Sequence, residues 1–166
     1  MTSMGNTWRS AAYVALSELE RKSEAVYNRY PKAPLITEVD ALSDMMKEAW
    51  PNDYTILFEL QMLSLYAIRE LIRIGEWDKH ELAYLLTTKQ HDYGTGNILA
   101  FGMIGIAVRM TDKLARLKNL ANKTAENEST IDTLHDIVGY AVVATMLDNE
   151  TFFIDNLGLD NDTVRN

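Results

Sequence analysis

Residues 91–147 read HDYGTGNILAFGMIGIAVRMTDKLARLKNL, then ANKTAEN, then ESTIDTLHDIVGYAVVATML. Apolar residues recur every three or four positions in the first and last of these segments, which is the spacing of one face of an α-helix. The sequence therefore predicts two long helices, over residues 98–120 and 128–147. The short polar connection between them predicts that the two helices are antiparallel neighbours.

Three carboxylates share one face of the second helix. Glu128, Asp132 and Asp136 follow one another at i,i+4 spacing, along the edge of the apolar stripe. Carboxylates clustered beside an apolar face repel one another unless a cation or protons intervene, and a divalent metal ion is a natural partner. The alternative is that the acids only complement the helix dipole. That account fits Glu128 in the first turn better than the two acids that we expect deeper in the helix.

The 98–120 helix offers a line of cations. Arg109, Lys113 and Arg116 lie on one sector of its surface, and Asp112 lies among them. Asp112 either forms an ion pair with Arg109 or Arg116, or faces the three acids of the next helix and completes a set of four carboxylates.

A polar segment with two glycines, HDYGTGN at residues 91–97, precedes this helix. We expect it to form a tight, exposed loop, whose backbone N–H groups can bind an anion. A plain connection between two helices remains the alternative, because the spacing matches neither of the glycine-rich nucleotide fingerprints.

Helical spacing and breaking residues organise the rest of the chain. Two prolines, Pro31 and Pro34, exclude one continuous helix through the first fifty residues. Gly75 is expected to end the helix on which Glu59 and Glu70 lie. Each of these glutamates is open to three interpretations: an exposed position, an ion pair with a nearby arginine, or a part in a site. The additional helices are expected over residues 6–28, 37–50, 53–74 and 78–90.

These elements predict an all-α helical bundle of five or six helices. We expect one domain over residues 1–157, with N-terminal helices in 6–50 and core helices in 53–147, and a frayed tail at 158–166. A chain of 166 residues with 47% apolar residues can form one sizeable core.

Charge and composition exclude several classes of protein. The net charge of −8 argues against a nucleic-acid coat protein and against a protein that binds anionic membranes, because both need a basic surface. The absence of cysteine removes disulfides, thiolate zinc sites and cysteine nucleophiles. The polar first ten residues do not resemble a secretory signal, and no apolar run reaches the length of a membrane span. We expect a cytoplasmic protein.

Four motifs together resemble a known family. They are KQHDYG at 89–94, VRMTDKLARL at 108–117, ESTIDTLHD at 128–136 and GYA at 139–141. Their combination resembles the nucleotide modification associated domain of phages and bacteria. That family is similar in outline to the MazG-like all-α nucleoside triphosphate pyrophosphohydrolases, in which acids from paired helices hold magnesium ions against a nucleotide's phosphates. The resemblance implies a MazG-like four-helix core and a role in nucleotide metabolism, in the host cytoplasm if the chain is phage-encoded.

The leading hypothesis from this resemblance is a Mg²⁺-dependent pyrophosphohydrolase that converts a deoxynucleoside triphosphate to a monophosphate and pyrophosphate, with Mn²⁺ as the alternative metal. The metal would polarise the α-phosphoryl group and activate water. The catalytic and metal-binding residues would be Asp112, Glu128, Asp132 and Asp136. The substrate-binding residues would be Lys89, Asp92, Tyr93, Asn97, Arg109, Lys113 and Arg116.

Within the substrate set, cations would neutralise the pyrophosphate. Tyr93 would stack on the base, and Asp92 or Asn97 would contact the base edge or the sugar. The resemblance also implies a homo-oligomer, a dimer or a tetramer. A competing hypothesis is an accessory factor that binds a nucleotide or a protein without chemistry. A purely structural bundle is the third, and it leaves the cation line unexplained.

Overall fold

The computed structural model describes residues 6–29, 52–120 and 129–159. Within these ranges the chain forms six α-helices and one 3₁₀ turn, so the predicted all-α bundle is confirmed. The helix predicted over 37–50, the end of the predicted tail at 160–166 and Glu128 lie outside the described residues. The elements are α1 (Trp8–Arg29), α3 (Asp53–Arg73), α4 (Lys79–Tyr93), α5 (Gly96–Leu99), α6 (Gly102–Leu120), α7 (Thr130–Asp148) and η2 (Thr151–Phe153).

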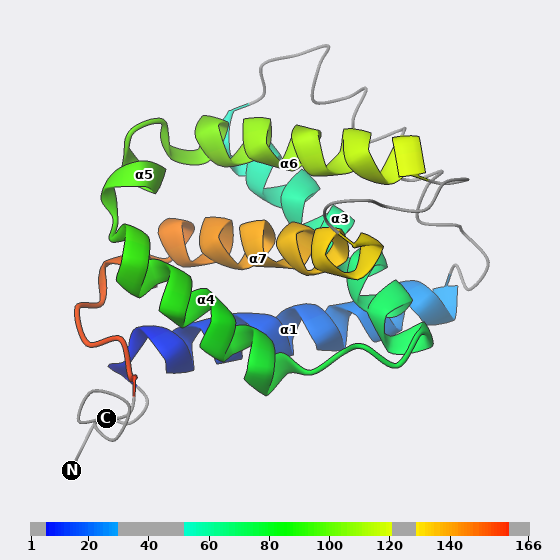
Figure 1. The fold of residues 1–166 in the computed structure, drawn as a ribbon, viewed down its shortest axis with the longest axis horizontal. Helices are drawn as coiled ribbons and strands as arrows, with labels where there is room; N and C mark the ends of the chain where they lie inside the picture. Colours follow the sequence, from blue (N-terminus) through cyan, green and yellow to red (C-terminus); the bar gives the residue numbers. More distant parts are fainter. Residues whose placement is uncertain (1–5, 30–51, 121–128, 160–166) are drawn as a thin grey trace.

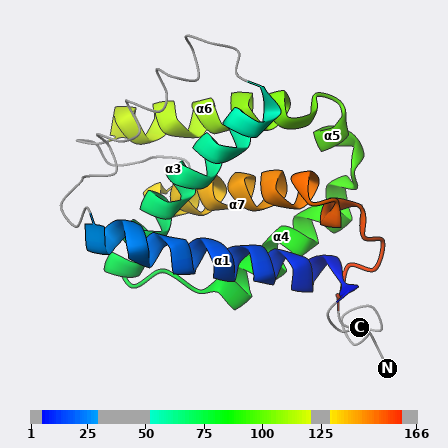
Figure 2. The same cartoon turned by 180° about the vertical axis from the view of Figure 1, so that it is seen from behind.

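Helix α7 is the centre of the bundle. Figure 1 shows it between α6 on one side and α1 on the other, with α4 crossing in front. Seen from behind, α3 crosses the other side of α7 (Figure 2). Helix α7 contacts all four of these long helices. The colours in Figure 1 also show that α6 and α7 run in opposite directions, as the short connection predicts. None of the helices in the described ranges has the combination of length and apolar character that a membrane span requires.

The apolar stripes of α6 and α7 form much of the core. Leu114 on α6 and Val138 on α7 are both fully buried, as the helical spacing predicts. Burial of a leucine or valine side chain stabilises the fold by about 1.5–3 kcal/mol. The core therefore fixes which faces of α6 and α7 remain for polar residues.

Local capping signals lie at the end of α3 and at the start of α4, where the sequence indicates. Gly75 has φ +76°, and the N–H groups of Gly75 and Glu76 donate to the carbonyls of Ile72 and Leu71, which is the pattern of a Schellman motif. Its predicted role is therefore confirmed. Asp78 caps α4 by accepting from the N–H groups of the first turn.

The start of α7 corrects the sequence-based position of one acid. The Ser129 side chain accepts a hydrogen bond from the Asp132 N–H at 3.0 Å, which places the first helical residue at Thr130. Asp132 therefore lies in the first turn, where a carboxylate complements the helix dipole, and not one turn deeper. Asp136 alone of the described acids in this line lies further inside the helix.

The predicted loop at residues 91–97 is also corrected. Helix α4 continues through Tyr93 and ends at Gly94, which has φ +66° and donates its N–H to the Gln90 carbonyl. The short helix α5 then separates α4 from α6, whose first residue, Gly102, has φ +60°. Exposed polar residues in a last helical turn have the same composition as a loop, so periodicity does not distinguish the two. Tyr93 is consequently held on a helix.

Two sets of contacts join segments that are distant in sequence. The Trp8 backbone N–H donates to Asn156 O at 2.8 Å, and the Trp8 indole donates to Phe152 O at 3.2 Å, so the start of α1 is joined to the segment after α7. Near the middle of α1, the Glu20 carboxylate accepts from the Trp77 indole at 2.6 Å and from the Lys79 ammonium at 2.8 Å. These contacts fix α1 against the ends of α7 and α4.

Candidate functional site

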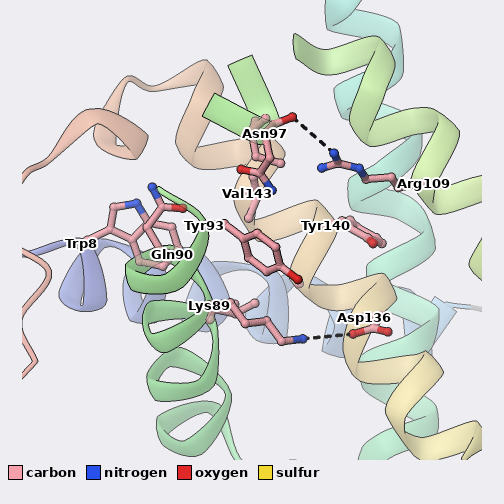
Figure 3. Close-up of a pocket in the computed structure, with 12 residues that line it drawn as sticks. Trp8, Lys89, Gln90, Tyr93, Asn97, Arg109, Asp136, Tyr140 and Val143 are labelled. Atoms are coloured by element: carbon pink, nitrogen blue, oxygen red, sulfur yellow. Dashed lines mark hydrogen bonds and ion pairs between the residues drawn. The ribbon is translucent and has the colours of Figure 1, made fainter. Parts of the chain in front are cut away.

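A pocket of about 420 Å³ lies where α4, α5, α6 and α7 meet the start of α1. We call it the α4–α7 pocket, and Figure 3 shows its lining side chains. Polar and aromatic groups share its wall with aliphatic ones. The lining residues are Trp8, Leu86, Lys89, Gln90, Tyr93, Asn97, Ile98, Arg109, Asp136, Gly139, Tyr140 and Val143.

Two helices supply most of the wall, and each does so with one face. Both α4 and α7 contribute residues at i, i+3, i+4 and i+7, which is the spacing of a single helical face. From α4 these are Leu86, Lys89, Gln90 and Tyr93, and from α7 they are Asp136, Gly139, Tyr140 and Val143. The pocket therefore lies between two facing helices.

Gly139 sets how closely these two helices approach. A Cβ atom added at Gly139 would lie 2.9 Å from Leu86 Cδ2, closer than side chains normally pack. Glycine thus allows Leu86 of α4 to lie directly against the backbone of α7. The close approach forms the part of the pocket wall where the two helices meet.

Charged groups connect three helices at one side of the pocket. The half-buried Asp136 carboxylate on α7 lies 2.9 Å from the Lys113 ammonium on α6 and 3.6 Å from the Lys89 ammonium on α4. Figure 3 shows Lys89 reaching from α4 towards Asp136. The guanidinium of Arg109 donates to the backbone carbonyl of Asn97 at 3.3 Å and joins α6 to α5. Three cations are therefore positioned at or beside the pocket by contacts within the fold.

Tyr140 lies among these charges. Burial raises the pKa of the Tyr140 phenol above its ordinary value of 10.0, and the Asp136 carboxylate raises it further, with a smaller contribution from Asp112. Lys113 and Arg109 act in the opposite direction but do not reverse the shift. The phenol therefore stays protonated at neutral pH and offers an O–H donor at the pocket wall.

The structure brings five of the predicted site residues to the pocket. Lys113, a sixth, does not line the pocket but forms an ion pair with Asp136, which does. The five that line the pocket are Lys89, Tyr93, Asn97, Arg109 and Asp136.

The remaining predicted residues within the described ranges do not line the pocket. Asp92 lies beside His91, at 3.1 Å, and Arg116 donates to the Thr133 hydroxyl at 3.1 Å. Asp112 and Asp132 are exposed. Among the described residues, no three or more Asp, Glu, His or Cys side chains form a group that could hold a metal ion. The described part of the predicted four-carboxylate set is thus not gathered around one point.

Several lining residues were not predicted. Gly139 and Val143 continue the helical line of Asp136, so their position was readable from the spacing once that line was known to face a pocket. Tyr140 lies four residues after Asp136 and carried the same signal. Trp8 gave no such signal, because only tertiary packing brings the start of α1 to this place. The full set of missed residues is Trp8, Leu86, Gln90, Ile98, Gly139, Tyr140 and Val143.

Comparison with known proteins gives one positive result. Neither the curated proteins nor the solved structures include a match to this chain. A family model does match the segment that contains every lining residue except Trp8 and Leu86. Residues 89–147, which run from the last turns of α4 almost to the end of α7, match the family described as nucleotide modification associated domain 1.

Proposed function

We propose that this protein binds a nucleoside triphosphate in the α4–α7 pocket and cleaves it to a monophosphate and pyrophosphate. The observation that carries the binding part is the composition of one pocket. Lys89 and Arg109 provide cations, while Tyr93 and Tyr140 provide aromatic rings, in a cavity of about 420 Å³. This volume lies in the range of small-molecule sites, about 300–1,000 Å³. The family match over 89–147, with its description of nucleotide modification, supports a nucleotide as the ligand.

The charged side of the pocket suits the phosphates. Lys89 and Arg109 line the pocket, and Lys113 adjoins them at Asp136. Hydrogen bonds from ammonium or guanidinium groups to phosphate oxygens are about twice as strong as neutral ones. The protonated Tyr140 hydroxyl adds a neutral donor to the same region.

The aromatic and amide groups of the same pocket suit a base. The ring of Tyr93 is 68% exposed, so one face can stack on a base, an interaction typically worth about 1–3 kcal/mol. The carboxamides of Gln90 and Asn97 each contain a donor and an acceptor, as recognition of a base edge requires. Trp8 is buried and its indole N–H already bonds to Phe152 O, so it only forms a wall.

The metal that the resemblance implies, Mg²⁺ or Mn²⁺, does not fit the described side chains as they lie. Both oxygens of Asp136 face lysine ammonium groups, and the exposed Asp112 and Asp132 do not line the pocket. Glu128 is outside the described residues. We therefore assign no step of the reaction to a metal. The binding proposal rests on the pocket, and the choice of reaction rests on the resemblance to MazG-like pyrophosphohydrolases.

A product assay tests the reaction. The protein is incubated with each common dNTP and NTP plus Mg²⁺, and the products are analysed for monophosphate and pyrophosphate. We expect one or a few nucleotides to be cleaved between the α- and β-phosphates. Production of phosphate and diphosphate instead would contradict the proposed reaction.

Variants of the pocket test the binding. Replacing Lys89 or Arg109 with Met removes a charge-assisted hydrogen bond worth about 1.5–3 kcal/mol, so we expect nucleotide affinity to fall about tenfold or more. Lys22→Met is the matched control, because Lys22 is an exposed lysine on α1 away from the α4–α7 pocket. Isothermal titration calorimetry measures the nucleotide affinity of the three variants. Equal affinities in the Lys89 and Lys22 variants would place the nucleotide elsewhere.

A non-catalytic accessory factor is the second candidate. The ion pairs of Asp136 favour it, because they occupy one of the four acids to which the hydrolase hypothesis assigns metal binding. Nucleotide binding without turnover of any nucleotide would select this function. Sedimentation of the wild type tests the proposed dimer or tetramer separately.

A further inference from the structure

We propose that Asp136 is an internal counter-ion of a phosphate subsite, and that an incoming phosphate displaces it from Lys89 and Lys113 without a divalent metal ion. The proposal rests on the nucleotide-binding function above and states how the same pocket takes the phosphate. It assigns Asp136 a role opposite to that of a metal ligand.

The Asp136 carboxylate lies between two lysine ammonium groups. Asp136 on α7 holds cations from two other helices, Lys113 of α6 at 2.9 Å and Lys89 of α4 at 3.6 Å. Two ammonium groups gathered at one carboxylate repel each other, and an anion between them offsets this repulsion. In the free protein the Asp136 carboxylate supplies that anion.

The two ion pairs are unequal. Lys113 and Asp136 have side chains that are each 21% exposed, whereas the Lys89 side chain is 50% exposed and makes the longer contact. A long side chain at such exposure gains little from one ion pair. Lys89 is therefore the cation that turns first to an entering anion, while Lys113 remains fixed beside the pocket.

A phosphate group is the stronger partner for these cations. It carries about −1.5 to −2 charges when it is a monoester, and several acceptor oxygens, whereas Asp136 carries one charge. Arg109 and the protonated Tyr140 hydroxyl lie in the same region and can donate to the additional oxygens. The exchange of Asp136 for phosphate thus replaces two contacts with as many as four.

The two possible roles of Asp136 predict opposite changes in anion affinity when Asp136 is replaced. If Asp136 only balances the lysines, then Asp136→Asn removes a competing anion and a negative charge beside the subsite, so anions should bind more tightly. If Asp136 holds a metal that carries the phosphate, the same change should weaken binding. One substitution therefore separates the two roles.

The test is titration of the full-length protein with inorganic pyrophosphate in EDTA. We expect wild type to bind, Asp136→Asn to bind about tenfold more tightly, and Lys113→Met to bind about tenfold more weakly. Asp148→Asn is the matched control, because it removes the same charge from the exposed end of α7, about 18 Å further along the helix. We expect it to bind like wild type.

The outcomes separate the two proposals. Weaker or unchanged binding by Asp136→Asn overturns the counter-ion role. A wild type that binds pyrophosphate with Mg²⁺ but not in EDTA overturns it as well, and this measurement needs no variant to fold. Titration with the cleaved nucleotide, or with dNTPs if none is cleaved, shows whether the pocket binds nucleotides at all. Nucleotide binding with no gain in Asp136→Asn would leave the proposed function standing while this inference fails.

Discussion

Two half-buried carboxylates, Glu20 and Asp136, are each held by two donors from other parts of the chain, but with different geometry. Glu20 accepts from Trp77 and Lys79 at 2.6 and 2.8 Å, and it is not among the residues that line the pocket. Asp136 has one contact of 2.9 Å and one of 3.6 Å, and it does line the pocket. The comparison suggests that Glu20 is a permanent structural contact, whereas Asp136 holds its partners only until a ligand replaces it.

A third acid, Glu59, shows how burial changes the pKa of a carboxyl group that accepts no hydrogen bond at one oxygen. Glu59 on α3 is 4% exposed, and its Oε2 has no hydrogen-bond partner. Burial raises the pKa of the Glu59 carboxyl. Burial also acts to raise the pKa of Glu20, but the hydrogen bonds from Lys79 and Trp77, together with the charges of Lys79 and Arg69, outweigh it and the pKa is lowered. The environment of each acid thus determines its expected effect on stability. Substitutions of the three acids can test this, with a substitution of a core leucine for comparison.

The largest loss of stability is expected from an uncharged residue that lies next to the Lys113–Asp136 ion pair. Leu114 follows Lys113 on α6 and is 1% exposed. We expect Leu114→Ala to lower the free energy of unfolding by about 2–4 kcal/mol, because it leaves a cavity in the core. Urea unfolding measures the change, with Lys113→Met as the comparison. If Lys113→Met lost as much stability as Leu114→Ala, the Lys113–Asp136 ion pair would contribute to stability as strongly as a core side chain.

Glu20→Gln should cost about 1–2 kcal/mol at pH 7, because it removes the charge that the Trp77 and Lys79 donors face. Since the folded pKa of Glu20 is lowered from 4.5, its contribution is complete above pH 4.5 and is lost as the pH falls through the folded value. The difference between wild type and variant should therefore shrink between pH 5 and about pH 3. Urea unfolding across this range tests it. A constant difference would show that the charge contributes nothing.

Glu59→Gln should stabilise the protein by about 1 kcal/mol at pH 7, because it removes a buried charge without donors. The raised pKa means that the folded state retains its proton longer than the unfolded state. Wild-type stability should therefore fall as the pH rises from 4.5 through the folded pKa, and the advantage of the variant should vanish below pH 4.5. Unfolding at pH 7 and pH 4 measures this. A loss of stability at pH 7 would indicate a donor near the Glu59 carboxylate.

The smallest change in stability is expected for Asp136→Asn, within about 1 kcal/mol, because its ion pairs are partly exposed and one is long. The measurement is the same urea unfolding at pH 7. A cost equal to that of Glu20→Gln would make Asp136 a permanent contact and remove the distinction between the two acids.

Much of the fold was predictable because long helices repeat their apolar spacing many times. The predicted helix at 53–74 is observed as α3 (Asp53–Arg73), and the one at 128–147 as α7 (Thr130–Asp148). Gly75 and Asp78 carried local signals that do not depend on tertiary structure. The end of α4 was missed, because its last turn is exposed and polar and shows no periodicity.

The site was only partly predictable, because it depends on which helices face one another. Spacing placed Asp132 and Asp136 on one line of α7, but the partners of Asp136 come from α4 and α6. The reason for a glycine at position 139 likewise depends on its contact with Leu86, more than fifty residues earlier in the chain. Periodicity describes the faces of one helix, and it cannot identify the side chains that a second helix places opposite them.

Helix α7 has the pocket on one face and the core on the other. Asp136, Gly139 and Tyr140 alternate with the fully buried Ile137 and Val138 along the same two turns. Backbone amides at the centre of such a helix exchange with solvent mainly when the whole molecule opens. A molecule held in the pocket should therefore slow deuterium uptake along the central turns of α7, including amides that it never touches, by a factor that reports its full binding free energy.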